Sequence, residues 1–365
     1  MTENGADGRE LVRVPAGELE RTAAGIFAAA GCDADEARRI AVELVGANLA
    51  GHDSHGVVRV PFYVSLLRAG HVRAGRTVEI VTDGGAFALL DGQFGFGQTI
   101  APQAVALGVE RASRDGICVV ALRNSGHVGR VGAYAETALA AGLISIHLVN
   151  VAGSPLVAPF GGVERRFSTA PFSVGVPLPD RPLVLDFATS LVAEGKVQVA
   201  SFGGPALPSD ALVEPDGSAS SDPHTLYGEY GPTDMRTPGN GAGAIRAFGG
   251  HKGSGLALMC ELLAGAFTGG GCAGPVEGPR GRIANGMLSI YLSPRHFGTQ
   301  GEFERVGRDY VEWVLSTRPS EPGGEVLLPG EQEARMKAAR LADGVPLPPA
   351  EWAAIQRVAA EVGAV

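Results

Sequence analysis

Residues 117–129 read Ile-Cys-Val-Val-Ala-Leu-Arg-Asn-Ser-Gly-His-Val-Gly, and they already indicate an α/β fold. The run from Ile117 to Leu122 is apolar and rich in β-branched side chains, which is typical of a buried strand. A polar turn from Asn124 to Gly129 follows, and a helix is predicted over residues 131–141. Because open α/β sheets place ligand sites at such strand ends, the turn predicts a site at His127.

Further β-rich runs extend this pattern through the middle of the chain. Strands are expected over residues 78–82, 86–90, 144–151, 172–177, 183–185 and 287–292. A second helix is expected over residues 253–267, with an apolar face that a sheet should cover; that face carries Leu256, Met259, Cys260, Leu263 and Phe267. Residues 213–243 are rich in Gly, Pro, Ser, Asp and Thr, which predicts a long surface loop.

Both ends of the chain are predicted to be helical. An apolar face with helical spacing is formed by Leu19, Ala23, Ile26, Phe27 and Ala30. Asp33 is placed to cap a helix that runs to about Ala50, and a third helix is expected after Asp53. Helices are also expected over residues 331–342 and 350–362. We therefore expect a helical domain over residues 1–76, joined by C-terminal helices in 305–365, and an α/β domain over 77–304 that binds cofactor and substrate.

Composition narrows the class of protein. The 365 residues are 45% hydrophobic and 19% charged with a net charge of −9, which argues against nucleic acid or an anionic membrane as partner. The four cysteines are widely spaced, without a Cys-x-x-Cys pair for zinc, so they are expected to be reduced and mostly buried. Residues 1–10 lack the features of a signal peptide, and no run reaches the roughly 18 apolar residues of a membrane span. The sequence therefore predicts a cytoplasmic protein.

The common nucleotide-binding motifs are missing or misplaced. Gly269, Gly271 and Gly274 match G-x-G-x-x-G, but a helix rather than a strand precedes them, so we interpret them as an exit loop. There is no P-loop motif and no G-x-S-x-G nucleophile elbow. A nucleotide would have to be bound by other means.

A first group of reactive side chains lies in His52-Asp53-Ser54-His55-Gly56, followed by Arg59. In the functional interpretation, Arg59 forms a bidentate pair with a substrate carboxylate and His55 donates a hydrogen bond nearby. In a structural interpretation, Asp53 caps a helix and the histidines are solvated. A metal site is a third alternative, but consecutive residues at a helix start rarely converge on one ion.

Three further motifs follow along the chain. His127 could act as a proton donor or base, or could merely cap the next helix. Residues 185–196 combine a strand end, hydroxyl residues able to cap a helix and Lys196, which suits an anion or nucleotide but also an ordinary turn. Residues 249–255, with Lys252 among glycines at a helix start, would also suit a phosphate.

Taken together and in this order, the motifs resemble the malate/L-lactate dehydrogenase family that lacks a Rossmann fold. The likeness covers nearly the whole chain and is carried by Asp53-Ser54-His55-Gly56 with Arg59 and Tyr63, Asn124-Ser125-Gly126-His127, Pro159-Phe160-Gly161-Gly162, residues 186–196, His251-Lys252-Gly253 and residues 325–331. Residues 129–132, 147–151 and 157–162 look most similar to the hydroxycarboxylate dehydrogenase branch, which accepts aromatic 2-oxo acids.

The resemblance implies an oxidoreductase that transfers a hydride between NAD or NADP and a small 2-hydroxy or 2-oxo acid. It implies that His127 gives a proton to the carbonyl oxygen, while Ser54, His55 and Arg59 line the substrate pocket. The implied cofactor contacts are Asp186, Phe187, Ala188 and Lys252, with no metal.

The family also implies an architecture: helical segments from both termini surround an α/β domain with a mixed, largely antiparallel sheet and non-Rossmann cofactor binding. The active site is expected near the subunit interface of a homodimer.

Two departures from the family pattern bear on substrate and cofactor binding. Ala170 stands where the family usually has asparagine, and Ser254 stands where tyrosine is common. Rival functions are a reductase of a cyclic 2-imino acid, a non-catalytic dinucleotide-binding dimer, and a metal-dependent hydrolase that uses His52 and His55.

Overall fold

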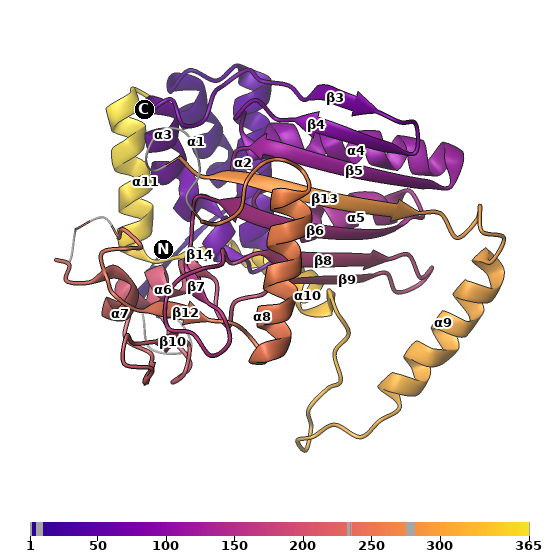
Figure 1. The fold of residues 1–365 in the computed structure, drawn as a ribbon. Helices are drawn as coiled ribbons and strands as arrows, with labels where there is room; N and C mark the ends of the chain where they lie inside the picture. The colour runs from indigo at the N-terminus through magenta and orange to yellow at the C-terminus, as the bar shows by residue number, and fades with distance from the viewer. Residues whose placement is uncertain (1, 5–9, 232–233, 235, 275–281, 365) are drawn as a thin grey trace.

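A computed structural model describes residues 2–4, 10–231, 234, 236–274 and 282–364. Its centre is a seven-stranded sheet with the order β3-β4-β5-β13-β6-β8-β9 (Figure 1). The strands are β3 (Glu79–Asp83), β4 (Phe87–Asp91), β5 (Ile117–Ser125), β6 (Ile144–Ala152), β8 (Pro171–Val176), β9 (Leu183–Ala188) and β13 (Ala284–Leu292). Within this sheet β4 and β5 are parallel, while the other neighbours are antiparallel. The predicted mixed, largely antiparallel sheet is confirmed.

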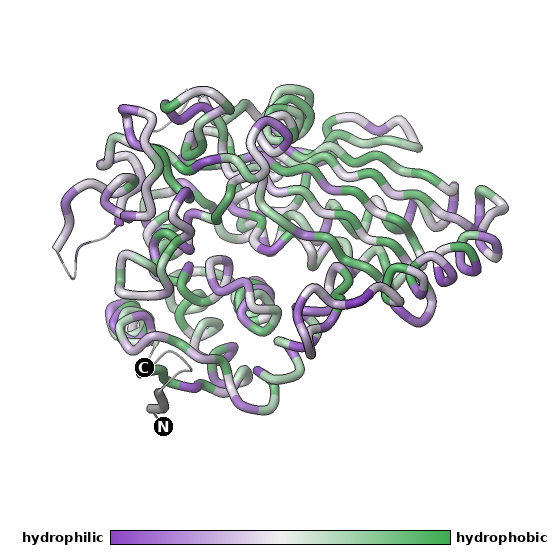
Figure 2. Tube along the Cα trace, turned by 90° about the horizontal axis from the view of Figure 1, so that it is seen from below, coloured by the Kyte–Doolittle hydropathy of each residue, from purple (hydrophilic) through white to green (hydrophobic). Residues whose placement is uncertain are grey.

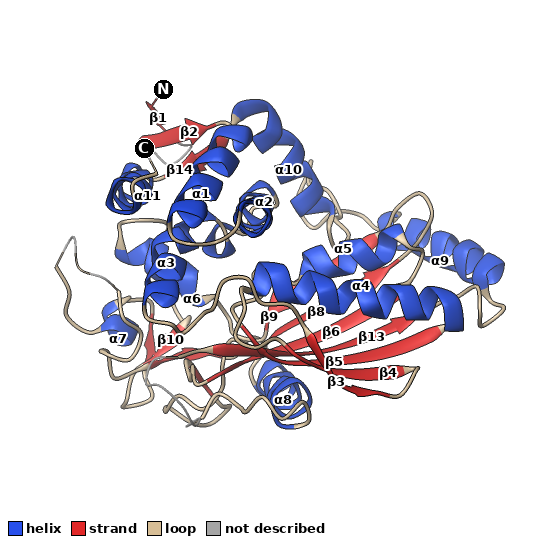
Figure 3. Ribbon diagram, turned by 90° about the horizontal axis from the view of Figure 1, so that it is seen from above, coloured by secondary structure: helices blue, strands red, loops and turns tan. Residues whose placement is uncertain are grey.

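Helices cover both faces of the sheet. On one face lie α4 (Gly97–Asp115) and α5 (Gly132–Ala140), and on the other lies α8 (His251–Cys260), which continues into the π-helical turn η3 (Glu261–Ala266) (Figure 3). The core under α4 and α5 is apolar because alternate strand residues point into it, among them Cys118, Val120 and Leu122 of β5. Hydrophobic residues accordingly line the strands of the large sheet (Figure 2). The sequence did not predict α4.

Segments from both termini share a second core beside the sheet. It is formed by α1 (Ala16–Ala29), α2 (Ala34–Leu49), α3 (Val60–Arg68) and α11 (Pro349–Val362) with the strands β2 (Glu10–Val14) and β14 (Val345–Leu347). The strand β1 (Thr2–Asn4) pairs with β2, and α10 (Glu331–Asp343) packs against α2. Leu19, Phe27 and Ile355 are among its buried members, so the predicted apolar face of α1 is confirmed. The Asp33 carboxylate accepts from the Glu36 N–H at 2.7 Å, which confirms the predicted cap of α2.

The predicted surface loop over residues 213–243 is partly wrong. Its described part contains a short helix, α7 (His224–Tyr227), and pairs in a four-stranded sheet. That sheet joins β7 (Val157–Ala158), β10 (Leu212–Val213), β11 (Ala219–Ser220) and β12 (Ala244–Arg246), with α6 (Glu194–Ser201) nearby. Leu226 and Tyr227 are fully buried there, because the turn residues surround an apolar core of their own. Residues 232, 233 and 235 of the predicted loop lie outside the described residues.

The predicted burial of the 253–267 helix is also wrong in detail. Cys260 is buried against the sheet together with Ala257 and Ala264, but Met259, Leu263 and Phe267 are exposed. The small side chains, rather than the large ones, face the sheet because α8 packs closely on it. An apolar outer face remains.

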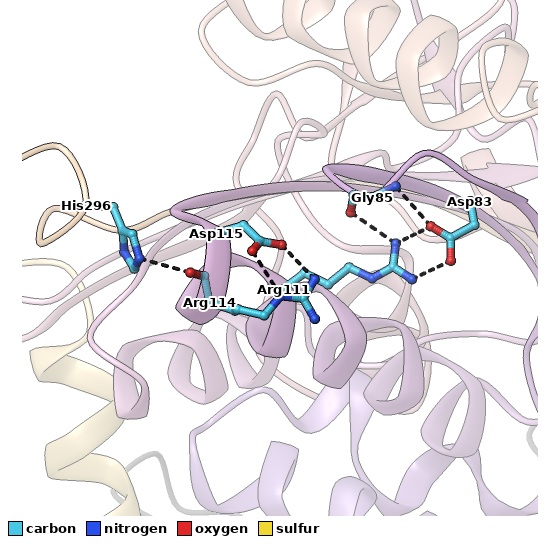
Figure 4. Close-up of polar contacts among 6 residues, drawn as sticks. All are labelled: Asp83, Gly85, Arg111, Arg114, Asp115 and His296. Atoms are coloured by element: carbon cyan, nitrogen blue, oxygen red, sulfur yellow. Dashed lines mark hydrogen bonds and ion pairs between the residues drawn. The ribbon is translucent and has the colours of Figure 1, made fainter.

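Polar contacts tie the edge of the sheet to α4 (Figure 4). Arg111 donates to both carboxylate oxygens of Asp83 at 2.8 and 2.7 Å and to the Gly85 carbonyl at 3.1 Å. Near the end of α4, Arg114 pairs with Asp115, and His296 lies 3.1 Å from the Arg114 carbonyl. The first contact lies at the edge strand β3 and the others at the end of α4, and none involves a predicted site residue. The helix α9 (Gln300–Leu315) projects from the body and buries none of its residues (Figure 1).

Candidate active site

His127 lies in the tight turn that follows β5. Asn124, near the end of β5, has a left-handed φ of 54°, a conformation that asparagine adopts more readily than most residues. The Gly126 N–H donates to the Gly95 carbonyl at 2.8 Å. A Cβ added to Gly97 would lie 2.1 Å from the His127 carbonyl oxygen, so only glycine permits this approach. The turn is therefore held by backbone contacts with the start of α4.

The Ser54–Arg59 segment is built from two 3₁₀ turns, Asp53–His55 and Val57–Arg59, and α3 begins only at Val60. The predicted helix after Asp53 thus starts later, and Asp53 does not cap it. Instead, the Asp53 carboxylate accepts two hydrogen bonds from Arg340, at 2.6 and 3.0 Å, and one from Asn48 at 2.7 Å. Because a bidentate guanidinium contact is strong and directional, α10 fixes the position of this turn.

The two segments bring a pair of imidazoles together. The rings of His55 and His127 stack at a centroid distance of 5.5 Å and an angle of 21°. The Ser54 hydroxyl lies 2.9 Å from Nδ1 of His55, and the Tyr63 hydroxyl lies 2.6 Å from Nδ1 of His127. The hydrogen-bonding capacity of each Nδ1 is thus used by a hydroxyl group. His127 does not cap α5, whose first turn has no side-chain cap.

Burial and positive charge keep both imidazoles neutral. Burial lowers the pKa of His127 to about 3, with a further contribution from the charge of Arg59. The pKa of His55 is also lowered, first by burial and then by His127 and Arg59. The dependence of both pKa values on Arg59 shows that these three predicted residues form one electrostatic unit.

Arg59 is held by two groups, one of which the sequence did not predict. Its Nε donates to the Ser54 carbonyl at 2.6 Å, and its Nη2 donates to the Glu194 carboxylate at 3.2 Å. The other Glu194 oxygen accepts from the buried Tyr227 hydroxyl at 2.6 Å. A Cβ on Gly195 would lie 2.4 Å from Cβ of Ser54, so α6 packs directly on the Ser54 turn. Tyr227 had no sequence signal because it lies in a stretch with loop composition.

A cleft of about 890 Å³ lies between α2, α5, β9, α9 and α10; its lining includes Arg130 but none of His55, Arg59 and His127. Asp186 lies on its wall, and one of its carboxylate oxygens accepts from the Gly132 N–H at 2.7 Å. Burial raises the pKa of Asp186. The other oxygen, Oδ1, has no hydrogen-bond partner among the described residues. The cleft thus contains an acceptor for a ligand hydroxyl or amide.

The other predicted cofactor residues lie elsewhere. Phe187 packs edge-on against Phe172 and Phe248, at centroid distances of 5.8 and 5.3 Å, on the face of the sheet opposite to Asp186. Lys252 is exposed in the first turn of α8, also on that face (Figure 3). Ala188 ends β9 and, like these two residues, does not line the cleft. Of the four, the cleft includes only Asp186.

The two departures from the family pattern have structural partners. Ser254 is buried, and its hydroxyl accepts from the Phe160 N–H at 2.9 Å, so it holds the Pro159–Gly162 loop. Ala170 is buried with a φ of 35°, a conformation unfavourable for alanine. The predicted hydroxyl caps of α6 are wrong, because Thr189 donates to the carbonyls of residues 169 and 170 and Ser190 to that of Val192.

The histidines proposed as metal ligands in one alternative have other partners. His52 lies 3.5 Å from the Glu333 carboxylate, whereas His55 contacts Ser54 and His127. Over residues 2–4, 10–231, 234, 236–274 and 282–364, no three His, Cys, Asp or Glu side chains are grouped to hold a metal. In the same part of the chain, no helix has the length and apolarity needed to cross a bilayer. The cysteines carry free thiols; three are buried and Cys272 is partly buried.

Comparison with known proteins gives consistent matches over nearly the whole chain. The sequence model of the family described as malate/L-lactate dehydrogenase matches residues 14–356. Hydroxycarboxylate dehydrogenase B of Escherichia coli K12 is 39% identical over 93% of this chain and 91% of its own. L-lactate dehydrogenase of Cupriavidus necator is 35% identical over 92% of this chain and 93% of its own. Malate dehydrogenase of Pyrococcus horikoshii superposes with a TM-score of 0.85 at 29% identity, covering 100% and 99% of the two chains.

Proposed function

The chain belongs to the malate/L-lactate dehydrogenase family, and on that premise we propose that it interconverts a small 2-hydroxy acid and its 2-oxo acid with a nicotinamide cofactor. The convergence of His127, His55 and Arg59 carries this proposal, because it places a proton-transferring group beside a cation that can bind a carboxylate. The relatives are named as dehydrogenases of hydroxycarboxylic acids, lactate and malate, which supports the same reaction class.

Arg59 would bind the acid through the end of its guanidinium group. Nε and Nη2 already donate to Ser54 and Glu194, while Nη1 has no partner among the described residues. The predicted bidentate pair through Nε and Nη2 is therefore not available, because both nitrogens already have partners. A carboxylate at Nη1 would orient the 2-oxo group and would offset part of the positive charge that lowers the pKa of His127.

His127 would move the proton. In the reduction it gives a proton to the carbonyl oxygen, and in the oxidation it takes that proton back from the hydroxyl group. When bound, the nicotinamide supplies or accepts the hydride at the substrate carbon. His55 and His127 are only partly exposed, and a bound substrate would cover them further, which would favour transfer to the substrate over loss to solvent.

The cleft lined by Asp186 is the proposed place for the cofactor. Its volume suits a ligand of this class, and the unpaired Asp186 oxygen offers an acceptor for a hydroxyl or amide group. The G-x-G-x-x-G match at Gly269, Gly271 and Gly274 does not line it, which supports non-Rossmann binding. Phe187, Ala188 and Lys252 stay predictions as cofactor contacts on the opposite face.

We propose NAD rather than NADP as the cofactor. The cleft is lined by more carboxylates than cations: Glu43, Glu136, Asp186, Glu304 and Glu333 against Arg130 and Lys337. Arg130 is moreover paired with Glu136. An added phosphate would meet mainly like charge, so kcat/KM for NADH should exceed that for NADPH at least tenfold. Fluorescence titration should give the same order of affinities.

The exposed apolar face of α8 and η3 supports a homodimer. Its members are Leu258, Met259, Leu262, Leu263 and Phe267. A contiguous apolar surface of this kind is typical of a subunit interface. Light scattering should report a dimer, and Phe267→Glu should shift it towards monomer. Dissociation by Tyr310→Glu on α9, but not by Phe267→Glu, would place the interface elsewhere.

The direct test of the reaction is an absorbance assay with NADH or NADPH and a panel of acids. Pyruvate, phenylpyruvate and oxaloacetate represent the hydroxy acid dehydrogenase activity, and a cyclic 2-imino acid represents the rival reductase. We expect NADH consumption with at least one 2-oxo acid, unaffected by a chelator. Turnover of the imino acid alone would overturn the proposal.

A further inference from the structure

The hydrogen-bond network around His127 includes two residues for which the proposed reaction has assigned no role. Tyr63 of α3 is 2% exposed, and its hydroxyl lies 2.6 Å from Nδ1 of His127. Gln98 of α4 is 1% exposed, and its Nε2 lies 3.1 Å from that hydroxyl and 3.1 Å from the His127 carbonyl oxygen. The three residues come from separate parts of the chain; Tyr63 and Gln98 are buried, and His127 is partly exposed.

The His127 carbonyl determines the direction of each hydrogen bond in this arrangement. A carbonyl oxygen can only accept, so the Gln98 atom facing it must be the amide nitrogen. The same nitrogen can only donate to the Tyr63 hydroxyl, which therefore accepts from Gln98. The single hydroxyl proton of Tyr63 is then directed to Nδ1 of His127, the remaining neighbour within hydrogen-bond distance among the described residues. Nδ1 accepts, and in the neutral ring the proton must be on Nε2.

We propose that Tyr63 is a positioning residue that holds His127 as its Nε2–H tautomer, with Gln98 fixing the direction of the Tyr63 hydroxyl. The proposal rests on the assignment of His127 as the proton-transferring group. Nε2 has no partner among the described residues, so the nitrogen that carries the proton is the one left for the substrate. When Nε2 gives its proton to the carbonyl oxygen, the Tyr63 hydroxyl passes its own proton to Nδ1, so the ring stays neutral and the Tyr63 oxygen keeps the hydrogen bond from Gln98. Nε2 then holds the lone pair that takes the substrate proton in the oxidation, while Nδ1 returns its proton to the Tyr63 oxygen.

A second tyrosine, Tyr134 of α5, contacts the same turn and provides a matched control. The Tyr134 hydroxyl donates to the carbonyl of Val128, the residue after His127, and Tyr134 is also 2% exposed. Tyr134→Phe therefore removes a buried phenol hydrogen bond from the same turn without touching the imidazole. A purely structural role for Tyr63 predicts the same consequences for Tyr63→Phe and Tyr134→Phe.

The experiment measures the tautomer directly and then turnover. Protein labelled with ¹⁵N-histidine, assigned with His127→Ala, should show His127 as the Nε2–H tautomer in the wild type and in Tyr134→Phe. Tyr63→Phe should give a mixture of tautomers and lower kcat about 10- to 10²-fold, with KM for the acid unchanged. Gln98→Met keeps the Tyr63 hydroxyl but removes the donor that directs it, so a smaller shift in the same direction is expected.

Three outcomes separate this inference from the proposed function. Full turnover by His127→Ala would remove the assigned role of His127 and this inference with it. An inactive His127→Ala together with a Tyr63→Phe variant that keeps the Nε2–H tautomer and wild-type kcat would overturn the inference alone. Equal losses in Tyr63→Phe and Tyr134→Phe, with the tautomer unchanged in both, would also overturn it, because they indicate a structural effect.

Discussion

His127 and His147 occupy two very different regions although burial lowers the pKa of each to about 3. Both also have a hydroxyl at Nδ1, Tyr63 at 2.6 Å for the first and Ser289 at 2.8 Å for the second. His127 lies in a turn at the end of β5, stacked on His55. His147 lies in the middle of β6, fully buried and edge-on to the rings of Tyr134 and Tyr291.

A lowered pKa alone therefore does not identify a catalytic histidine. Burial is the sole cause for His147, whereas the charge of Arg59 contributes at His127. A bound acid can offset that charge, so ligand binding can change the protonation of His127 but not that of His147. We therefore expect the function of His127 to depend on the charge of Arg59, which a bound substrate can offset.

The largest effect is expected from replacing the two histidines in turn. His127→Ala should lower kcat about 10³-fold, because the proton donor is lost while the fold is kept. His147→Asn places a smaller polar side chain beside Ser289. It should leave kcat within about twofold of the wild-type value under conditions in which the variant is folded. Single-turnover assays of both variants check this. His55→Ala is the third member of the set: a larger loss there than in His127→Ala would move the donor role to His55.

A second prediction concerns the charge that separates the two regions. Arg59→Ala should lower kcat/KM for the acid about 10²-fold, mainly through KM, because the carboxylate loses its cation. Arg123→Ala is the matched control. Arg123 of β5 pairs with Asp91 of β4 at 2.9 Å and contacts neither His55 nor His127. Initial-rate kinetics with varied acid measure both. An unchanged KM in Arg59→Ala would contradict the proposed carboxylate site.

The third prediction uses pH to compare the regions. The pKa of His147 is lowered in the folded state relative to its ordinary value near 6.5, so below that pH the unfolded chain binds more protons. Its contribution to stability is fully present above pH 6.5 and is lost as the pH falls towards 3. The loss in unfolding free energy at pH 5 should be about 2 kcal/mol. Urea unfolding at pH 7 and pH 5 measures the loss, which should be smaller in His147→Asn. Equal losses in both proteins would show that His147 does not titrate on unfolding.

Local sequence signals sufficed for the elements whose burial follows a simple period. The apolar run after Ile117 became β5, and the i, i+4, i+7, i+8 spacing from Leu19 to Phe27 became the buried face of α1. Local sequence signals failed to predict α4, because Pro102 interrupts the helical pattern and glycines stand where larger residues would mark a face. Those glycines have tertiary reasons: a Cβ on Gly108 would lie 2.2 Å from the Tyr291 ring.

The site was predictable only in part for the same reason. His127, His55, Ser54 and Arg59 carry motifs, and the structure brings them together. Gln98 lies in the helix that was not predicted, and Tyr227 lies in the supposed loop, so neither could be paired with the site from sequence. The exposed side of α8 could not be predicted either, since helical periodicity does not distinguish a face covered by the chain's own sheet from one left exposed.

The smallest expected effect comes from deleting the hydroxyl partner of His147. Ser289→Ala removes the contact at Nδ1 and leaves a buried polar atom unpaired, which should cost about 1 kcal/mol of unfolding free energy. Because His147 lies within the sheet and its only cause of pKa change is burial, kcat and its pH profile should not change. Tyr63→Phe makes the equivalent deletion at His127 and should change both. Denaturant unfolding and pH–rate profiles of the two variants test whether only the hydroxyl partner of His127 affects catalysis. An altered pH profile in Ser289→Ala would mean that the two histidines are coupled across the sheet, and it would contradict the difference proposed between them.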